Sequence, residues 1–128
     1  MKTQLLIFSF AVSTLAMAQV GRAEEPPKEN TGYAFNELRS VDLPVGRKLR
    51  MCLHRIEPGG AMALHDHKGR PAVNYVLKGT MVARQMGTPD QVLHVGDGLA
   101  EGKDTPPHWF VNNTSEPVEF VEVDIVRP

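Results

Sequence analysis

The stretch PGGAMALHDH, residues 58–67, carries the strongest structural signal in this sequence. It places two histidines one residue apart, shortly after two glycines that favour a turn. Side chains on an extended strand alternate between its two faces, so His65 and His67 share one face and Asp66 points to the other. Two imidazoles on one face can converge on one ion. The stretch therefore predicts a strand that ends in a metal site.

The sequence around this stretch predicts an all-β domain. Short apolar runs recur about every ten residues, Gly, Pro, Asn and Asp separate them, and no window has a convincing helical stripe. Pro58-Gly59-Gly60 is expected to end a strand that covers 51–56. The pair Lys78-Gly79 predicts a hairpin between strands at 72–77 and 80–85, because glycine accepts the positive φ of a tight turn. The remaining predicted strands cover 61–67, 91–95, 99–101, 108–111 and 118–126.

The first 23 residues have the composition of a secretory signal peptide. Lys2 precedes an apolar run over 5–17, which is too short to cross a bilayer as a helix and is followed by no stop-transfer pattern. Small residues favour cleavage after residue 18, and Gly21-Arg22-Ala23 offers a second site after residue 23. We therefore expect a periplasmic or secreted protein that has no membrane segment once the signal is removed.

The rest of the chain is long enough for one small domain. Residues 24–39 are expected to hold a flexible leader and the first strand, because the sequence up to about Tyr33 is polar and interrupted by proline. Residues 40–128 are expected to form the folded domain.

Charge and cysteine content exclude some partners and linkages. Residues 1–23 contain two basic side chains and no acid, so their removal leaves 12 basic and 15 acidic side chains, a net charge of −3. No stretch gathers the Lys and Arg cluster that nucleic-acid binding needs, so no nucleic-acid partner is expected. Cys52 is the only cysteine, so an intramolecular disulfide cannot form. Stability must come from the core, a metal or oligomerisation.

The histidine stretch and the sequence after it resemble the two motifs of the cupin superfamily over about residues 40–126. The first motif has a Gly, five residues, His-x-His, three or four residues, a Glu, six residues and a Gly. Four residues fall in register with it, namely Gly59, His65, His67 and Gly79. His108, followed by Asn112, resembles the second motif with one residue more. The resemblance implies a small antiparallel jelly-roll β-barrel with an ion in its mouth.

One departure from the family pattern concerns the glutamate of the first motif. That position corresponds to Ala72 or Val73, so no carboxylate is supplied there. The resemblance then implies a site of three histidines, His65, His67 and His108, which suits one divalent transition metal such as Fe, Mn, Zn, Ni or Cu. The alternative is a cupin that has lost its metal together with the glutamate and keeps the pocket for a ligand.

Two polar side chains are candidates for catalytic roles beside the ion. The alternation that turns Ala72 inward also turns Asn74 inward, where it can orient a water molecule or substrate or satisfy a backbone group. Glu101 is a candidate pocket group for positioning substrate, as is Gln85.

Other residues have two interpretations each. Cys52 and His54 share one strand face, which lies either inside the barrel near the ion or outside it. Arg70 and Arg84 are either clamps for a substrate carboxylate or, more typically, solvated charges. Trp109 is expected in the core or at an interface.

Two functions from different classes fit these features. The first is a metal-dependent, oxygenase-like oxidoreductase that acts on a small molecule. The alternative is a non-catalytic cupin that binds a small molecule or metal for sensing, storage or delivery. Sugar isomerisation, which some cupins perform, is a weaker option because no acid and base pair is evident for it. The resemblance also implies a homodimer.

Overall fold

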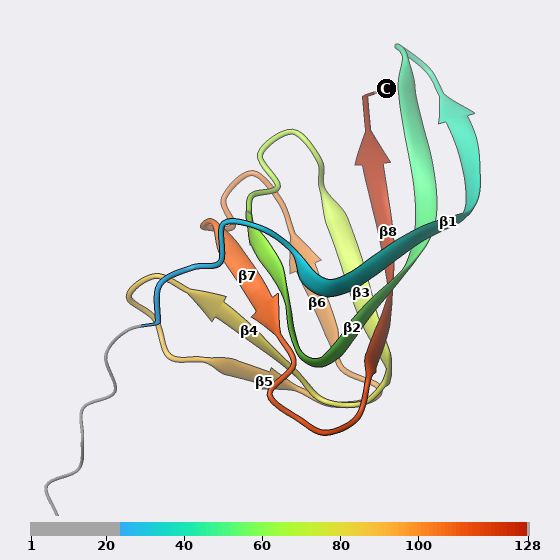
Figure 1. Cartoon of the computed structure of the whole chain (residues 1–128). Helices are drawn as coiled ribbons and strands as arrows, with labels where there is room; N and C mark the ends of the chain where they lie inside the picture. Colours follow the sequence, from blue (N-terminus) through green and yellow to red (C-terminus); the bar gives the residue numbers. More distant parts are fainter. Residues whose placement is uncertain (1–23, 128) are drawn as a thin grey trace, which may run out of the picture.

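The computed structural model describes residues 24–127, and these form eight β-strands and no helix (Figure 1). The predicted signal peptide lies outside the described residues. Within them, no helix is long and apolar enough to cross a membrane. The strands are β1 (Thr31–Leu43), β2 (Arg47–His65), β3 (Ala72–Lys78), β4 (Met81–Gln85), β5 (Gln91–Leu93), β6 (Gly98–Glu101), β7 (His108–Val111) and β8 (Val118–Val126).

All of the paired strands run antiparallel and curve into a nearly closed barrel. Their hydrogen-bonded order is β5-β4-β7-β2-β8-β3-β6, and β1 pairs with β2. β2 pairs with β1 from Arg47 to Ala61 and with β8 from Lys48 to Ile56, while its residues from Ala61 to His65 pair with β7. β2 thus belongs to both facing parts of the barrel (Figure 1). This confirms the predicted all-β, jelly-roll fold.

The prediction that a strand ends at Pro58-Gly59-Gly60 is wrong, because β2 continues through these residues. Gly59 has a φ of 74°, and its N–H donates a hydrogen bond of 2.8 Å to the Asn112 carbonyl. A Cβ on Gly60 would lie 2.6 Å from the Thr31 carbonyl oxygen. Gly59 supplies a positive φ and Gly60 allows the close backbone contact, so the two glycines bend the strand instead of ending it.

The predicted hairpin at Lys78-Gly79 is also wrong. β3 pairs with β8 and β6, whereas β4 pairs with β5 and β7, so the turn carries the chain across the barrel. The expected positive φ is present, at 76° for Gly79. A Cβ there would lie 2.6 Å from the Pro117 carbonyl oxygen, so glycine is needed for packing against the start of β8 as well as for the turn.

The first strand begins close to Tyr33, where the sequence predicts the start of fixed structure. β1 starts at Thr31, two residues before Tyr33. Ahead of β1, the Pro27 carbonyl accepts a hydrogen bond from the Leu64 N–H at 3.1 Å, and the Asn30 side chain accepts one from the Ala63 N–H at 2.7 Å. These two hydrogen bonds join residues 27–30, which precede β1, to the last residues of β2 beside His65.

The barrel interior is apolar in one region and polar in the next. On β3, Ala72, Asn74 and Val76 are buried while their neighbours along the strand are exposed, as the alternation predicts. On β8, the inward face carries Val118 and Phe120 and then two acids. The apolar core consists of Ile56, Met62, Val76, Met81, Ala83, Leu93, Phe110, Val118 and Phe120. The polar region beside this core contains the candidate site.

Candidate metal centre

The three histidines singled out in the sequence lie together inside the barrel. His65 is the last residue of β2, His67 follows two residues later, and His108 is the first residue of β7, where it is the cross-strand partner of His65. Their ring centroids are 4.5 Å apart for His65 and His108, and 5.3 Å apart for the other two pairs. One ring nitrogen from each lies within 4.8 Å of the other two. This grouping has the geometry of a metal site.

Each of the three rings is held by a hydrogen bond at Nδ1. The partners are the carbonyl oxygens of Ala63, Arg70 and Pro106, at 2.8, 2.8 and 2.9 Å from His65, His67 and His108, respectively. A carbonyl can only accept, so Nδ1 carries the proton and the Nε2 lone pair of the neutral ring is free. All three Nε2 atoms are buried and have no hydrogen-bond partner of good geometry among the described residues. Buried orphan lone pairs that converge in this way fit a metal ion.

Burial keeps two of the rings neutral. It lowers the pKa of His65 to about 4 and also lowers the pKa of His67. Burial acts in the same direction on His108, but the adjacent Glu101 carboxylate outweighs it and raises the pKa of His108. Metal-binding histidines must be deprotonated at the ligating nitrogen, and the environments of His65 and His67 favour that state.

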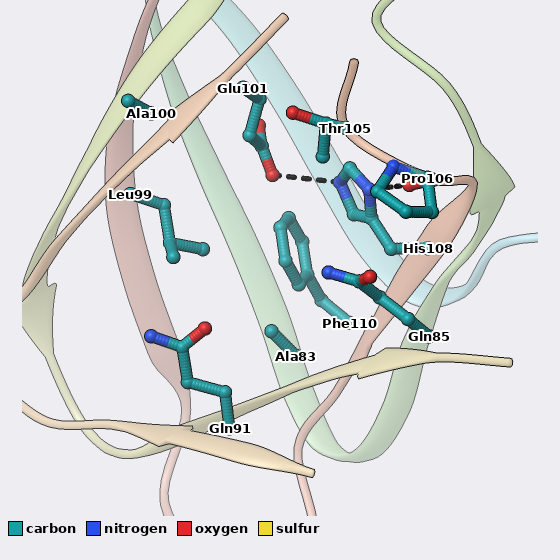
Figure 2. A pocket seen from close by; sticks show the side chains of 10 residues that line it. All are labelled: Ala83, Gln85, Gln91, Leu99, Ala100, Glu101, Thr105, Pro106, His108 and Phe110. Carbon is teal, nitrogen blue, oxygen red and sulfur yellow. Dashed lines mark hydrogen bonds and ion pairs between the residues drawn. The ribbon is translucent and has the colours of Figure 1, made fainter. Parts of the chain in front are cut away.

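Glu101, at the end of β6, faces His108 (Figure 2). Its Oε1 lies 2.7 Å from His108 Nε2, and its Oε2 lies 3.1 Å from His67 Nε2. The Asn74 side chain donates a hydrogen bond of 2.7 Å to Oε2. Burial alone would raise the pKa of Glu101, but His108, His67 and Asn74 together bring it below its usual value. Both predicted catalytic residues therefore lie at the site, with Asn74 bound to Glu101.

A cavity of about 280 Å³ adjoins Glu101 and His108 (Figure 2). Phe110, Leu99 and Ala83 form part of its wall, and Gln85 and Gln91 present amide groups. Within residues 24–127, the side chains that line it include no Lys or Arg. The cavity therefore suits a small molecule that is recognised by hydrogen bonds and apolar contact.

A buried group of charged residues on β8 was missed in the sequence. Asp124 accepts two hydrogen bonds from Arg50, at 3.0 and 2.7 Å, and Arg70 Nη1 lies 2.6 Å from Glu122 and 2.9 Å from Asp124. Burial raises the pKa of Glu122 to about 7. The two acids lie on the same face of β8 as Phe120, because side chains alternate along the stretch 118–126. This shared spacing with Phe120 could have predicted from the sequence that they are buried.

The structure decides between the two roles that the sequence allows for Arg70, Arg84 and Trp109. Arg70 binds the protein's own acids, and Arg84 pairs with Asp90 and Glu24, so the structure gives neither the role of a substrate clamp. Trp109 is buried with Ala61 and Val111, as expected of a core residue.

Cys52 and His54 face the barrel interior. Burial raises the pKa of the Cys52 thiol to about 11, so the thiol stays protonated. The Tyr33 hydroxyl lies 2.7 Å from His54 Nδ1, and the His54 ring stacks on Phe120 with a centroid distance of 4.7 Å. His54 is thus a packed core histidine beside the metal centre.

His54 should make the free energy of unfolding depend on pH. Burial, with Arg70 adding to it, lowers its pKa from 6.5 to about 4. Between these values the unfolded chain binds more protons than the folded one, so His54 lowers stability as the pH falls from 6.5 to 4, by up to about 1.4 kcal/mol per pH unit. In metal-free protein, urea unfolding of a His54→Phe variant should show a shallower loss over this range. Parallel curves for the variant and the wild type would contradict the assignment.

The jelly-roll barrel and the inward-facing histidine group define a cupin. Residues 52–124 match the Cupin domain family model (Cupin_2), and the chain belongs to this family. The resemblance seen in the sequence is thereby confirmed. Among curated proteins, no significant match is found.

Many solved structures share the fold. A cupin-superfamily sugar phosphate isomerase from Silicibacter pomeroyi DSS-3 is 27% identical with a TM-score of 0.57, over 65% of this chain and 61% of that protein. This chain thus spans less than two thirds of that protein's length. The polyketide cyclase RemF from Streptomyces resistomycificus is 22% identical with a TM-score of 0.64, over 80% and 72%. A Thermus thermophilus protein is 25% identical with a TM-score of 0.58, over 83% and 91%.

Proposed function

We propose that this protein binds one divalent transition metal through His65, His67 and His108 and acts on a small molecule as a metal-dependent, oxygenase-like enzyme. The observation that carries the proposal is the convergence of three buried Nε2 atoms, none of which has a hydrogen-bond partner of good geometry. Imidazole ligands suit Fe, Mn, Zn, Ni or Cu, and neutral nitrogen donors disfavour Mg and Ca. The metal supplies open coordination positions at which oxygen or an oxygen-containing substrate can be activated.

The protein's own groups have separate tasks in this proposal. The Nδ1 hydrogen bonds to Ala63, Arg70 and Pro106 hold the rings in their ligating tautomer. The cavity beside His108 admits the substrate, and the Gln85 and Gln91 amides offer hydrogen bonds to it. Phe110 and Leu99 limit the entry of water on the apolar side.

Elemental analysis of purified protein tests the metal site. Wild-type protein should carry one transition metal per chain, and a His65→Ala/His67→Ala variant should carry almost none, because two of the three nitrogen donors are gone. His94→Ala is a matched control, since His94 lies in an exposed turn after β5. Equal metal content in the wild type and the double variant would refute the site.

Oxygen consumption then tests the enzyme. Metal-loaded protein is assayed with an oxygen electrode across phenolic, thiol and diketone substrates, and turnover should depend on the histidines. Absence of turnover in every class, with stabilisation by metal alone in a thermal-shift assay, would favour the alternative of a non-catalytic binding cupin. One observation favours that alternative: among the described residues that line the cavity, the only carboxylate is Glu101, and it already contacts Asn74 and His108.

The cavity chemistry argues against a phosphorylated sugar as substrate. Phosphate recognition usually uses Arg or Lys, and the lining of this cavity includes neither in the part of the chain that the structure describes. The activity named for the Silicibacter pomeroyi protein is therefore not the one we propose here.

Export and pairing of two copies are further parts of the proposal. The apolar run over 5–17 supports export to the periplasm or outside the cell. Exposed apolar side chains on the β1–β2 ribbon, including Phe35, Val41 and Met51, support a homodimer. N-terminal sequencing of exported protein and sedimentation analysis test these two predictions.

A further inference from the structure

Glu101 is in contact with two of the three histidines through separate oxygen atoms. Oε1 is 2.7 Å from His108 Nε2, Oε2 is 3.1 Å from His67 Nε2, and the Glu101 side chain is 3% exposed. A carboxylate oxygen is an acceptor only, and each Nε2 is also an acceptor because the proton is on Nδ1. Acceptors this close repel each other unless a cation lies between them.

Two kinds of cation can relieve this repulsion. A proton on His108 Nε2 satisfies that contact alone and leaves the Nε2 atoms of His65 and His67 without partners. A divalent metal ion held by the three nitrogens relieves both close contacts that Glu101 makes with His67 and His108. It also compensates the buried negative charge, which three neutral imidazoles do not.

The strand register explains how a carboxylate reaches this position. The family's glutamate is expected at Ala72 or Val73, and Ala72 is the direct cross-strand partner of Glu101. Side chains of directly opposite residues start about 5 Å apart on the same sheet face, so a longer side chain on β6 can cover the space above Ala72. Asn74, two residues along the same face of β3, holds Glu101 through its hydrogen bond to Oε2.

We infer that Glu101 is the fourth protein ligand of the metal, and that this chain has moved the carboxylate from β3 to the adjacent strand β6. The inference rests on the proposed metal site. It replaces the substrate-positioning role that the sequence suggested for Glu101. It also accounts for the missing carboxylate at Ala72, because the small alanine side chain leaves room for the carboxylate of Glu101 on the adjacent strand.

Cobalt binding by chelator-stripped, full-length protein tests the inference, with Co²⁺ as the probe. Removal of a ligand should weaken binding by at least the roughly 10- to 100-fold typical of lost outer-sphere partners, so Glu101→Ala should raise the Co²⁺ Kd by that factor or more. Its visible absorption spectrum should also change, because the coordination sphere changes. Glu119→Gln is the matched control, since it alters a carboxylate that pairs with Arg55 at the surface and should keep the wild-type spectrum.

A carboxylate swap provides the second test. Ala72→Glu/Glu101→Ala returns a carboxylate to β3 and should recover most of the affinity lost in Glu101→Ala. If the swap does not fold by circular dichroism, Glu101→Gln serves instead, and its weaker amide ligand should give a spectrum distinct from both wild type and Glu101→Ala.

The outcomes separate this inference from the proposed function. Wild-type affinity and spectrum in Glu101→Ala, together with loss of Co²⁺ in His67→Ala, would overturn the role of Glu101 and leave the histidine site standing. Unchanged binding in His67→Ala as well would refute the metal site itself.

Discussion

An Arg70→Met variant should lose up to about 3–5 kcal/mol of unfolding free energy at pH values above 7, where Glu122 is ionised in the wild type; this is the cost typical of removing one partner from a buried ion pair. Arg70 contacts both Glu122 and Asp124, and both carboxylates are fully buried. Asp124 keeps Arg50, but Glu122 loses the only cation that directly contacts it among the described residues. Methionine retains much of the apolar part of the arginine side chain, so the loss of unfolding free energy comes from the missing charge and not from a loss of side-chain volume.

Urea unfolding at several pH values measures this loss. The deficit should shrink as the pH falls, because protonation of Glu122 removes the uncompensated charge. Arg55→Met is the matched control, since Arg55 pairs with Glu57 and Glu119 at the surface, and its stability should stay close to that of the wild type. A double variant with Glu122→Gln should regain part of the loss. A loss in Arg70→Met that is the same with and without Glu122 would contradict the interpretation.

Phe120→Ala should destabilise the protein by about 3–5 kcal/mol, the range for a large-to-small change of a buried aromatic residue. Phe120 is 0% exposed, stacks on His54 at 4.7 Å and packs edge-on against Phe110 at 5.7 Å. It therefore joins the apolar core to the polar region of the barrel, and its loss leaves a cavity between them.

Phe35→Ala is the control of the same chemistry. Phe35 is 45% exposed and contacts the edge of the same His54 ring, so its removal should cost only about 1 kcal/mol. Both variants should be compared by urea unfolding with an unchanged m-value. Equal costs for the two phenylalanines would show that the interior between His54 and Phe110 is not packed as described.

Much of the fold could be predicted from the sequence because strand alternation is a local property. The inward positions of Asn74 and His54, and the shared face of His65 and His67, follow from a period of two once the strands are recognised. Which strands pair with each other could not be predicted from this alternation. Lys78-Gly79 has the composition of a hairpin, yet β3 and β4 lie on different parts of the barrel.

The candidate site shows the same division. Histidine spacing and the family resemblance predict one site for His65, His67 and His108, and the structure places the three within reach of one ion. Their role as ligands stays a prediction. Glu122 escaped notice because an acid in an alternating stretch is usually on the solvent side, and only its phase with Phe120 indicates otherwise.

The sequence by itself determined the class of fold, the histidine pair at 65 and 67, and the absence of a carboxylate at Ala72. Only the tertiary structure decided that Glu101 lies across from Ala72 and faces the histidines, and that Arg70 neutralises buried acids instead of a substrate. The physical reason is that spacing along a strand fixes which face a side chain takes, whereas its neighbours across strands depend on long-range hydrogen bonding. His65 and His67 lie close together in the sequence, but the carboxylate that faces them, Glu101, comes from a strand far away in the chain.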